Sequence, residues 1–204
     1  MTLTFYTNPM SRGRIARWML EEVGVAYDTV ILDYAASMKE DAYLAVNPMG
    51  KVPAIVHDGK VVTEGAAICA YLAETFPEAG LAPTAEERAD YYRWMFYAAG
   101  PVEAAVTNRA LGVTPSPDQQ RMVGYGSYET MVDTFANAVA AQPYFAGNRF
   151  TAADVYAGSQ VIWGMQFGSL PKLPVFEEYV ARVTQRDAYK RASAIDDGLM
   201  EPQG

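Results

Sequence analysis

Residues Asn47–Ile68, NPMGKVPAIVHDGKVVTEGAAI, carry the strongest structural signal in this chain. Two β-prone runs, Ala54–His57 and Lys60–Thr63, flank an Asp-Gly dipeptide, and Asp-Gly between such runs is typical of a tight β-hairpin. Pro53 stands just before the first run, where its missing N–H removes no central ladder hydrogen bond. The residues that follow Gly65 are rich in helix formers. The stretch therefore predicts a hairpin that leads into a helix.

The residues before the hairpin predict a strand, a helix and a second strand. Ser11 suits a helix N-cap, and Gly24 suits the helix end. The expected elements are a strand at Leu3–Tyr6, a helix at Ser11–Val23, a strand at Val25–Leu32 and a short helix near Asp41–Ala45. Two strands joined through a helix, followed by a hairpin and a final helix, indicate a thioredoxin-like α/β domain.

The pattern changes after residue 77. Two prolines and a glycine between Phe76 and Pro83 predict a linker, and the later chain shows helical periodicity without a convincing strand. We predict a thioredoxin-like domain at 1–77, a linker at 78–83 and an all-helical domain at 84–204. The expected helices cover 84–111 (one long or two in tandem), 118–141, 151–166, 175–186 and 189–195, with a loose tail from residue 196.

Composition excludes several classes of function. The net charge of −8 argues against a nucleic-acid surface, and no apolar run is long enough to span a membrane. The start of the sequence lacks the pattern of a secretory signal, so cytoplasm is the expected location. The single cysteine, Cys69, rules out an internal disulfide and a multi-cysteine zinc site, and we expect no metal. The single histidine, His57, is expected to be a surface or edge residue rather than a catalyst.

The sequence NPxGKVP, the hairpin and the following T-E-x-x-A-I-x-x-Y-L resemble the glutathione-binding half of the cytosolic glutathione S-transferases. The resemblance implies a cis Val52–Pro53 bond and a Val52 backbone that pairs with the cysteinyl part of glutathione. It also implies that Lys51 pairs with the glycyl carboxylate, and that Glu64 and the Gly65 N–H hold the γ-glutamyl end. The family usually has serine where this chain has Gly65, and the lost hydroxyl bond is worth roughly 0.5–1.5 kcal/mol.

The same resemblance leaves the group that activates the thiol open. A free thiol has a pKa of about 8.5, and a helix N-terminus can lower it by supplying positive potential and N–H groups. Ser11 opens the first helix and places a hydroxyl about where serine-type members carry one, with Arg12 and Arg14 adding local charge. Tyr6 ends the first strand, as in tyrosine-type members, and the Arg-Gly-Arg after Ser11 also resembles some of those members. The alternatives are Ser11, Tyr6, a backbone N–H, or no such group. Ser11 could equally be only an N-cap, and Tyr6 only a core aromatic.

A second landmark lies in the helical half. Residues 147–155, GNRFTAADV, resemble the buried capping box and hydrophobic staple of the transferase helical domain, which assigns Thr151 and Asp154 a structural role.

The resemblance also implies a homodimer formed through the third and fourth helices, with exposed aromatic candidates at Tyr91, Tyr92, Trp94 and Phe96. Met and aromatic side chains suit a second-substrate pocket, for which the candidates are Met10, Phe96, Tyr97, Arg109, Trp163 and Met165.

Three functions follow as expectations. The first is a transferase that adds the thiolate of glutathione, its co-substrate, to a small, largely apolar electrophile. The second is a binding protein of the same fold without catalysis. The third is a glutathione-dependent disulfide or dehydroascorbate reductase, which would prefer a cysteine at the first helix, where this chain has Pro9-Met10-Ser11. Cys69 is expected to be a buried small residue and so does not supply that thiol.

Overall fold

The computed structural model describes residues 2–200. Its internal contacts divide the chain into two compact units. The first unit joins the chain up to Ala82 with the segment from Gln185 onward, and the second is Pro83–Thr184. The two domains with the boundaries given above stay a prediction, because contacts do not test whether either part folds alone.

The first unit is built on a four-stranded sheet, counted over the described residues, in the order β2-β1-β3-β4. The strand β1 pairs parallel with β2 and antiparallel with β3, and β3 pairs antiparallel with β4. The bounds are Leu3–Thr7 for β1, Asp28–Ile31 for β2, Ala54–His57 for β3 and Lys60–Thr63 for β4. The predicted thioredoxin-like topology and both hairpin strands are confirmed.

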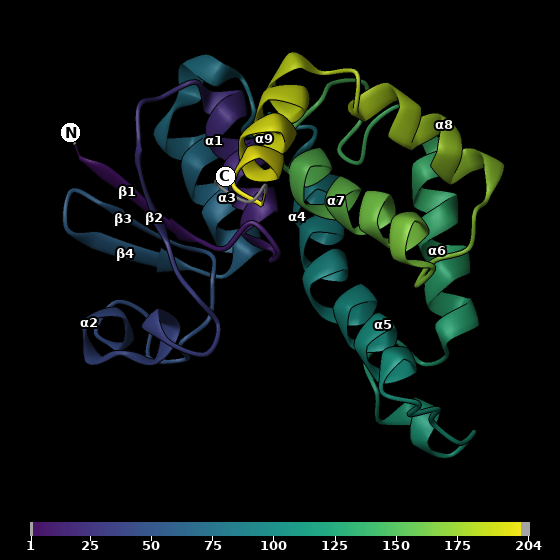
Figure 1. Cartoon of the computed structure of the whole chain (residues 1–204). Coiled ribbons are helices and arrows are strands. Elements are labelled where there is room, and N and C mark those ends of the chain that lie inside the picture. Colours follow the sequence, from purple (N-terminus) through teal and green to yellow (C-terminus); the bar gives the residue numbers. More distant parts are fainter. Residues whose placement is uncertain (1, 201–204) are drawn as a thin grey trace. The chain divides into compact units, whose positions relative to one another are not determined.

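Helices cover both faces of this sheet (Figure 1). The helices α1, Gly13–Val23, and α3, Gly65–Thr75, pack together on one face, where the guanidinium of Arg17 lies 5.1 Å from the Phe5 ring. On the other face the short helix α2, Asp41–Leu44, contributes Tyr43 to a buried cluster with Ala54, and the partly buried Tyr6 packs against this cluster. Alternation along β1 therefore sends Phe5 and Tyr6 to opposite faces.

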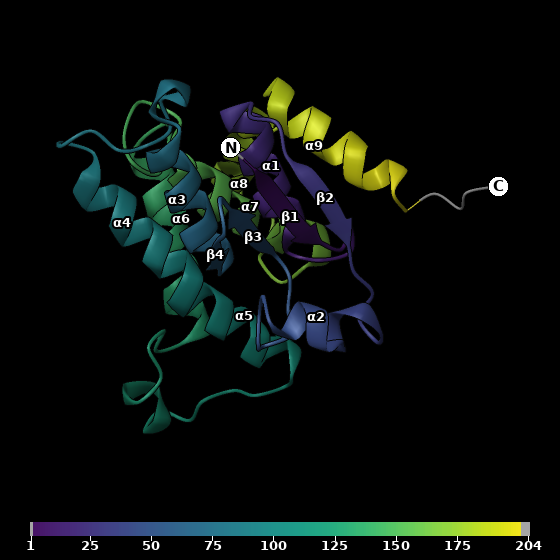
Figure 2. The same cartoon turned by 90° about the vertical axis from the view of Figure 1, so that its left-hand side faces the viewer.

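The last helix, α9, spans Asp187–Gly198 and packs against α1 within this unit. Figures 1 and 2 both show α9 alongside α1. The expectation of a loose tail from Asp196 is wrong for the described part, because the Asp196 side chain is buried in an ion pair with Arg17. Residues 201–204 of that expected tail lie outside the described residues.

The second unit is helical throughout its regular elements. Residues 84–111 were predicted to form one long helix or two in tandem, and they contain two helices separated by a π-helical turn at Ala98–Val102, which contains Pro101. Proline has no N–H to donate within a helix, so the wider turn at this point has a local cause. Figure 2 shows the two flanking helices running on from one another. The bounds are Arg88–Tyr97 for α4, Glu103–Ala110 for α5, Tyr128–Ala141 for α6, Ala152–Phe167 for α7 and Pro174–Val183 for α8.

Two predictions for this unit need correction. The helix expected from Asp118 begins only at Tyr128, because Gly126 adopts a φ of +65° and the Ser127 side chain caps the helix by accepting the Thr130 N–H. Tyr91 and Trp94, expected to be exposed, are buried, since positions three apart on α4 share its inner face. The other two aromatics are exposed: Tyr92 and Phe96 lie on the outer face with their rings stacked 6.3 Å apart.

Candidate functional site: one end of the mixed sheet

The predicted glutathione-binding residues follow or precede strand ends that meet at one end of the sheet. In the observed register Tyr6 pairs with Ala54, and Ala54 pairs with Thr63. The end of β1, the start of β3 and the end of β4 are therefore adjacent. The loop before α1, the Lys51–Pro53 segment and the Glu64–Gly65 step all leave the sheet at this end.

The Val52–Pro53 peptide bond is cis, as expected. Among the described residues, neither the N–H nor the C=O of Val52 forms a hydrogen bond. The carbonyl just before it is fully engaged, because the Lys51 C=O accepts from the Tyr43 hydroxyl at 2.5 Å and from the Asn47 amide at 2.7 Å. The segment is thus held from one side, while the Val52 backbone retains a donor and an acceptor for an extended peptide ligand.

The N-terminus of α3 is open. Its first helical hydrogen bond runs from the Ile68 N–H to the Glu64 carbonyl at 2.9 Å, so the N–H groups of residues 65–67 have no partner within the helix. Glu64 is the N-cap, but its side chain makes no capping bond. Its backbone has φ +65° and ψ 118°, a conformation that is strained for a residue with a side chain. Free N–H groups and the helix dipole together favour a bound anion such as a carboxylate.

Ser11 lies before the first helix and does not open it. The helix α1 begins at Gly13 with Arg12 as its N-cap, so the prediction that Ser11 is the N-cap is wrong. The Ser11 hydroxyl donates to the Asn8 carbonyl at 2.6 Å and accepts the Gly13 N–H at 2.9 Å. A Cβ at Gly13 would stand 1.9 Å from Thr7 Oγ1, so only glycine fits where the strand turns into the helix. The hydroxyl can therefore serve a ligand only by turning its proton away from Asn8.

The Tyr6 ring packs on the α2 face of the sheet. Its centroid lies 5.5 Å from that of Tyr43, and it contacts the buried cluster that contains Leu32 and Met38. This environment agrees with the alternative in which Tyr6 is only a core aromatic. Ser11, in contrast, lies just before α1, at the positive end of the helix dipole.

The sequence reasoning missed a repeated motif that shapes the site. The tripeptide Asn-Pro-Met occurs at residues 8–10, directly before Ser11, and at residues 47–49, two residues before Lys51. Each asparagine accepts the N–H two residues later, at 2.9 Å for Asn8 and 3.1 Å for Asn47. Each also donates its amide to a backbone carbonyl, from Asn8 to Leu32 and from Asn47 to Lys51. Asn-Pro is a turn signal in its own right, so this feature was available from sequence.

His57 and Cys69 are both buried. His57 was expected at the surface or edge, and this is wrong: β3 is an inner strand, and the imidazole lies beneath α3 with Nδ1 2.8 Å from the Tyr71 hydroxyl. For Cys69 the expected burial is confirmed, and it raises the pKa of the thiol far above its ordinary value. A neutral, inaccessible thiol is not a nucleophile.

The candidates for a second-substrate pocket differ in exposure. Met10, in the first unit, has 77% of its surface exposed, and Phe96, in the second, has 69%. The Tyr97 hydroxyl donates to the Met131 carbonyl at 3.1 Å, and the Arg109 guanidinium stacks 4.1 Å above the Tyr128 ring. Trp163 and Met165 are half-buried on α7. The common pocket stays a prediction.

The capping box of α7 is confirmed. Asp154 Oδ2 accepts the Thr151 N–H at 2.9 Å, while Oδ1 accepts the Phe145 N–H at 2.8 Å and the Tyr179 hydroxyl at 2.9 Å. Burial raises the pKa of the Asp154 carboxyl to about 6 despite these donors, which act in the opposite direction.

Within residues 2–200 no group of His, Cys, Asp and Glu side chains is arranged to hold a metal ion. The described helices are also too short or too polar to cross a bilayer.

The fold and this site place the chain among thioredoxin-like proteins that carry a helical second unit. The family model for the N-terminal domain of glutathione S-transferases matches residues 1–74. Glutathione S-transferase GstA of Escherichia coli is 30% identical over 154 residues, which are 71% of this chain and 73% of that protein. Glutathione S-transferase 3 of Schizosaccharomyces pombe is 32% identical over 162 residues, 71% of this chain and 66% of that protein. The chain belongs to the glutathione S-transferase family, which is a family of transferase enzymes.

The structural comparison agrees. The theta-class glutathione S-transferase of Xanthomonas axonopodis pv. citri, solved with glutathione bound, superposes with a TM-score of 0.73 at 28% identity. The match covers 94% of this chain and 97% of that one, so it includes both units.

Proposed function

We propose that the protein binds glutathione at this end of the sheet and transfers its thiolate to a small, largely apolar electrophile. The observation that carries the proposal is the unpaired Val52 backbone beside the open N-terminus of α3. An extended peptide can pair with the first, and a carboxylate can bind at the second. A glutathione-bound relative with the same fold supports this choice of ligand.

Each end of the tripeptide has a partner of suitable chemistry. The exposed Lys51 side chain pairs with the glycyl carboxylate, and the Glu64 carboxylate pairs with the γ-glutamyl amino group. The Gly65 N–H takes the γ-glutamyl α-carboxylate at the start of α3. Val52 and Pro53 position the cysteinyl residue between them, which brings its sulfur toward the loop before α1.

The reaction needs no general-base histidine. The helix dipole of α1 and the positive charge of Arg12 stabilise the thiolate, so the thiol proton is lost to solvent before the reaction. The sulfur then forms a bond to the electrophilic carbon, which gives up its leaving group or its π electrons. Ser11 stabilises the thiolate by turning its hydroxyl from the Asn8 carbonyl to the sulfur.

A non-catalytic glutathione-binding protein is the second candidate. The observation in its favour is that the Ser11 proton is already donated to Asn8 and that Gly65 lacks the hydroxyl usual in the family. A disulfide reductase is disfavoured, because Cys69 is buried and its thiol is held neutral.

We also propose a cytoplasmic homodimer that uses the exposed, stacked Tyr92 and Phe96. Sedimentation as a monomer at micromolar concentration would contradict the dimer.

The function is tested by glutathione titration calorimetry and a conjugation assay with a model aryl halide. Ser11→Ala should lower kcat/KM by about 10²-fold, since losing one donor to a developing anion has an effect of this size. The pH profile should also move toward the free-thiol pKa of about 8.5. Tyr6→Phe and the control Ser116→Ala, in an exposed loop of the second unit, should behave as wild type. Absence of glutathione binding would refute the proposal, and binding without conjugation would favour the second candidate.

A further inference from the structure

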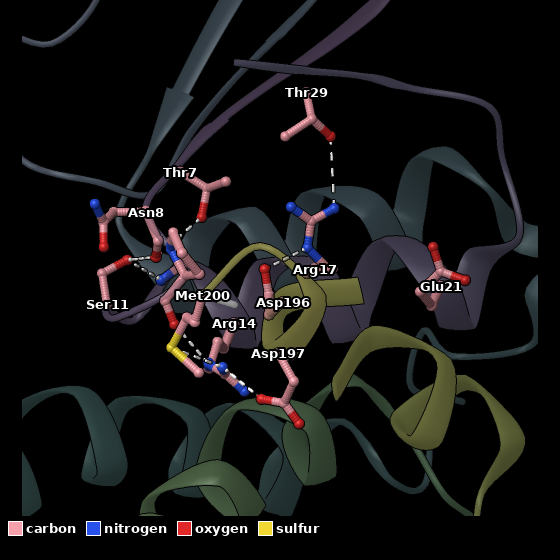
Figure 3. A network of polar contacts seen from close by, with 12 residues as sticks. Thr7, Asn8, Ser11, Arg14, Arg17, Glu21, Thr29, Asp196, Asp197 and Met200 are labelled. Carbon is pink, nitrogen blue, oxygen red and sulfur yellow. Dashed lines mark hydrogen bonds and ion pairs between the residues drawn. The ribbon is translucent and has the colours of Figure 1, made fainter. Parts of the chain in front are cut away.

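The pairing of α1 with α9 contains an ordered series of ion pairs. Arg14 and Arg17 on α1 face Asp197 and Asp196 on α9, in both cases at 2.7 Å (Figure 3). Toward the other end of the two helices the arrangement is reversed, with the acidic residues on α1. There Glu22 of α1 pairs with Arg186 at 2.6 Å, and Glu21 pairs with Arg191 at 3.1 Å. The two helices are therefore antiparallel, and each charge meets its opposite.

In the Arg14–Asp197 ion pair, each charge is of the sign that is unfavourable at its own end of its own helix. Arg14 lies in the first turn of α1, and Asp197 lies in the last turn of α9. A cation at a helix N-terminus and an anion at a helix C-terminus are both unfavourable in isolation. Local helix stability therefore does not explain these residues, whereas their contact with each other does.

This first pair also reaches the loop that carries Ser11. While Arg14 Nη2 donates to Asp197 Oδ1, its Nε donates to the Pro9 carbonyl at 2.6 Å. Met200 adds a weaker contact to the same Nη2, at 3.6 Å from its sulfur. One guanidinium thus joins the last turn of α9 to the peptide two residues before Ser11. Its orientation determines where that carbonyl is held.

The rest of the loop is held by partners near it in the first unit. The Asn8 amide is fixed on Leu32, and the Met10 carbonyl accepts the Tyr34 hydroxyl at 3.1 Å. The Pro9 carbonyl is the point at which α9 reaches the loop, through the Arg14–Asp197 pair, whose members are 183 residues apart in sequence. The charged groups of the two helices nearest this point are Arg14 and Arg17 on α1 and Asp196 and Asp197 on α9, which pair with one another.

We propose that the last turn of α9 positions the Ser11 loop for thiolate stabilisation, with Asp197 acting through Arg14 on the Pro9 carbonyl. Asp197 and Arg14 are positioning residues, and the inference rests on the proposed function of this site. Asp197 acts by geometry, because its carboxylate orients the guanidinium. An asparagine at that position can still accept the Nη2 hydrogen bond, whereas an alanine cannot.

The test compares Asp197→Ala, Asp197→Asn and the matched control Arg191→Gln. The control removes an ion pair between the same helices at the end remote from Ser11. Hydrogen exchange without glutathione is measured on the peptide covering residues 8–13, whose Met10, Ser11 and Gly13 amides are hydrogen-bonded. We expect several-fold faster exchange in Asp197→Ala and wild-type exchange in Asp197→Asn and the control. Unchanged exchange in Asp197→Ala, or equal acceleration in the control, would overturn the positioning contact.

The second measurement is the pH profile of conjugation. Asp197→Ala should lower kcat/KM for glutathione about tenfold, because small misplacements at a reacting centre have effects of this order or larger. It should also displace the profile toward higher pH, and Asp197→Asn should restore most of both. A wild-type profile in Asp197→Ala despite faster exchange would overturn the catalytic consequence. If the wild type neither binds nor conjugates glutathione, the proposed function fails, whereas the exchange result still decides whether α9 holds the loop.

Discussion

The N-termini of α3 and α7 are two solutions to the same problem. Every helix begins with N–H groups that have no partner within it. At α7 the Thr151–Asp154 box satisfies them, and both residues are fully buried. At α3 the N-cap is Glu64, which makes no capping bond and adopts a strained backbone conformation.

The difference separates stability from function within one chain. The α7 start is closed by its own side chains, so a ligand has nothing to bind there. The α3 start leaves donors exposed beside a backbone that also lacks partners, which lowers local stability but provides a binding surface. Substitutions at the two helix starts should therefore affect different observables.

The largest effect should come from Asp154→Ala. Its carboxylate serves the Phe145 and Thr151 N–H groups and the Tyr179 hydroxyl, and the substitution leaves these buried donors without an acceptor. We expect a loss of about 4 kcal/mol in the free energy of unfolding, measured with urea. Asp118→Ala, at an exposed carboxylate, is the control.

Glutathione affinity, measured where Asp154→Ala is still folded, should stay within about twofold of wild type, a change well under 1 kcal/mol. A stable Asp154→Ala protein that had lost glutathione binding would erase the proposed separation between the two helix starts.

The pH dependence of stability sharpens the same point. Burial raises the pKa of Asp154 to about 6, from 3.8, so the folded state binds this proton more tightly than the unfolded chain does. The resulting stabilisation is present below pH 3.8 and is lost as the pH rises through about 6. Relative to Asp154→Asn, which does not titrate, the wild type should gain roughly 2.4 kcal/mol between pH 8 and pH 4. A difference that is flat with pH would show that the carboxyl keeps its ordinary pKa.

Local signals predicted the hairpin and α3 well. An Asp-Gly turn between two β-prone runs fixes both strands, and their bounds agree with the structure. The capping box of α7 was also predictable, because Thr151 and Asp154 are three residues apart and the box itself forms between these two residues. Each of these features depends on residues that are close in sequence.

Features that depend on distant residues were missed. Nothing near Asp196 indicates that Arg17, 179 positions earlier, will bury it. The β propensity of His57 does not reveal that its strand lies inside the sheet. The prediction that Ser11 is the N-cap failed for a different reason: the Asn8 turn delays the helix start by two residues, and a good capping residue does not identify which N–H it will meet.

Glu64→Gly should move stability and binding in opposite directions. Glycine tolerates φ +65°, so the strain is relieved and the protein should gain about 1 kcal/mol in thermal or urea unfolding. Glutathione should bind about tenfold more weakly, since the partner of its amino group is lost. Glu64→Gln, which keeps the strain and removes the charge, should weaken binding without any gain in stability. Equal stability of the glycine and glutamine variants would show that the backbone conformation is not strained.

The smallest effect, and the most direct test of the open α3 start, is Gly65→Ser. A serine hydroxyl at this first helical position can add one hydrogen bond to the γ-glutamyl carboxylate. We expect glutathione to bind about three- to tenfold more tightly by calorimetry, which corresponds to roughly 0.5–1.5 kcal/mol for one hydrogen bond. Stability should change little, because the helix begins at Gly65 with an ordinary negative φ that serine can adopt. Ala66→Ser, one position further into the same turn, is the matched control. If neither variant binds more tightly, the carboxylate does not lie over the N-terminus of α3, and the ligand orientation proposed for this end of the sheet is wrong.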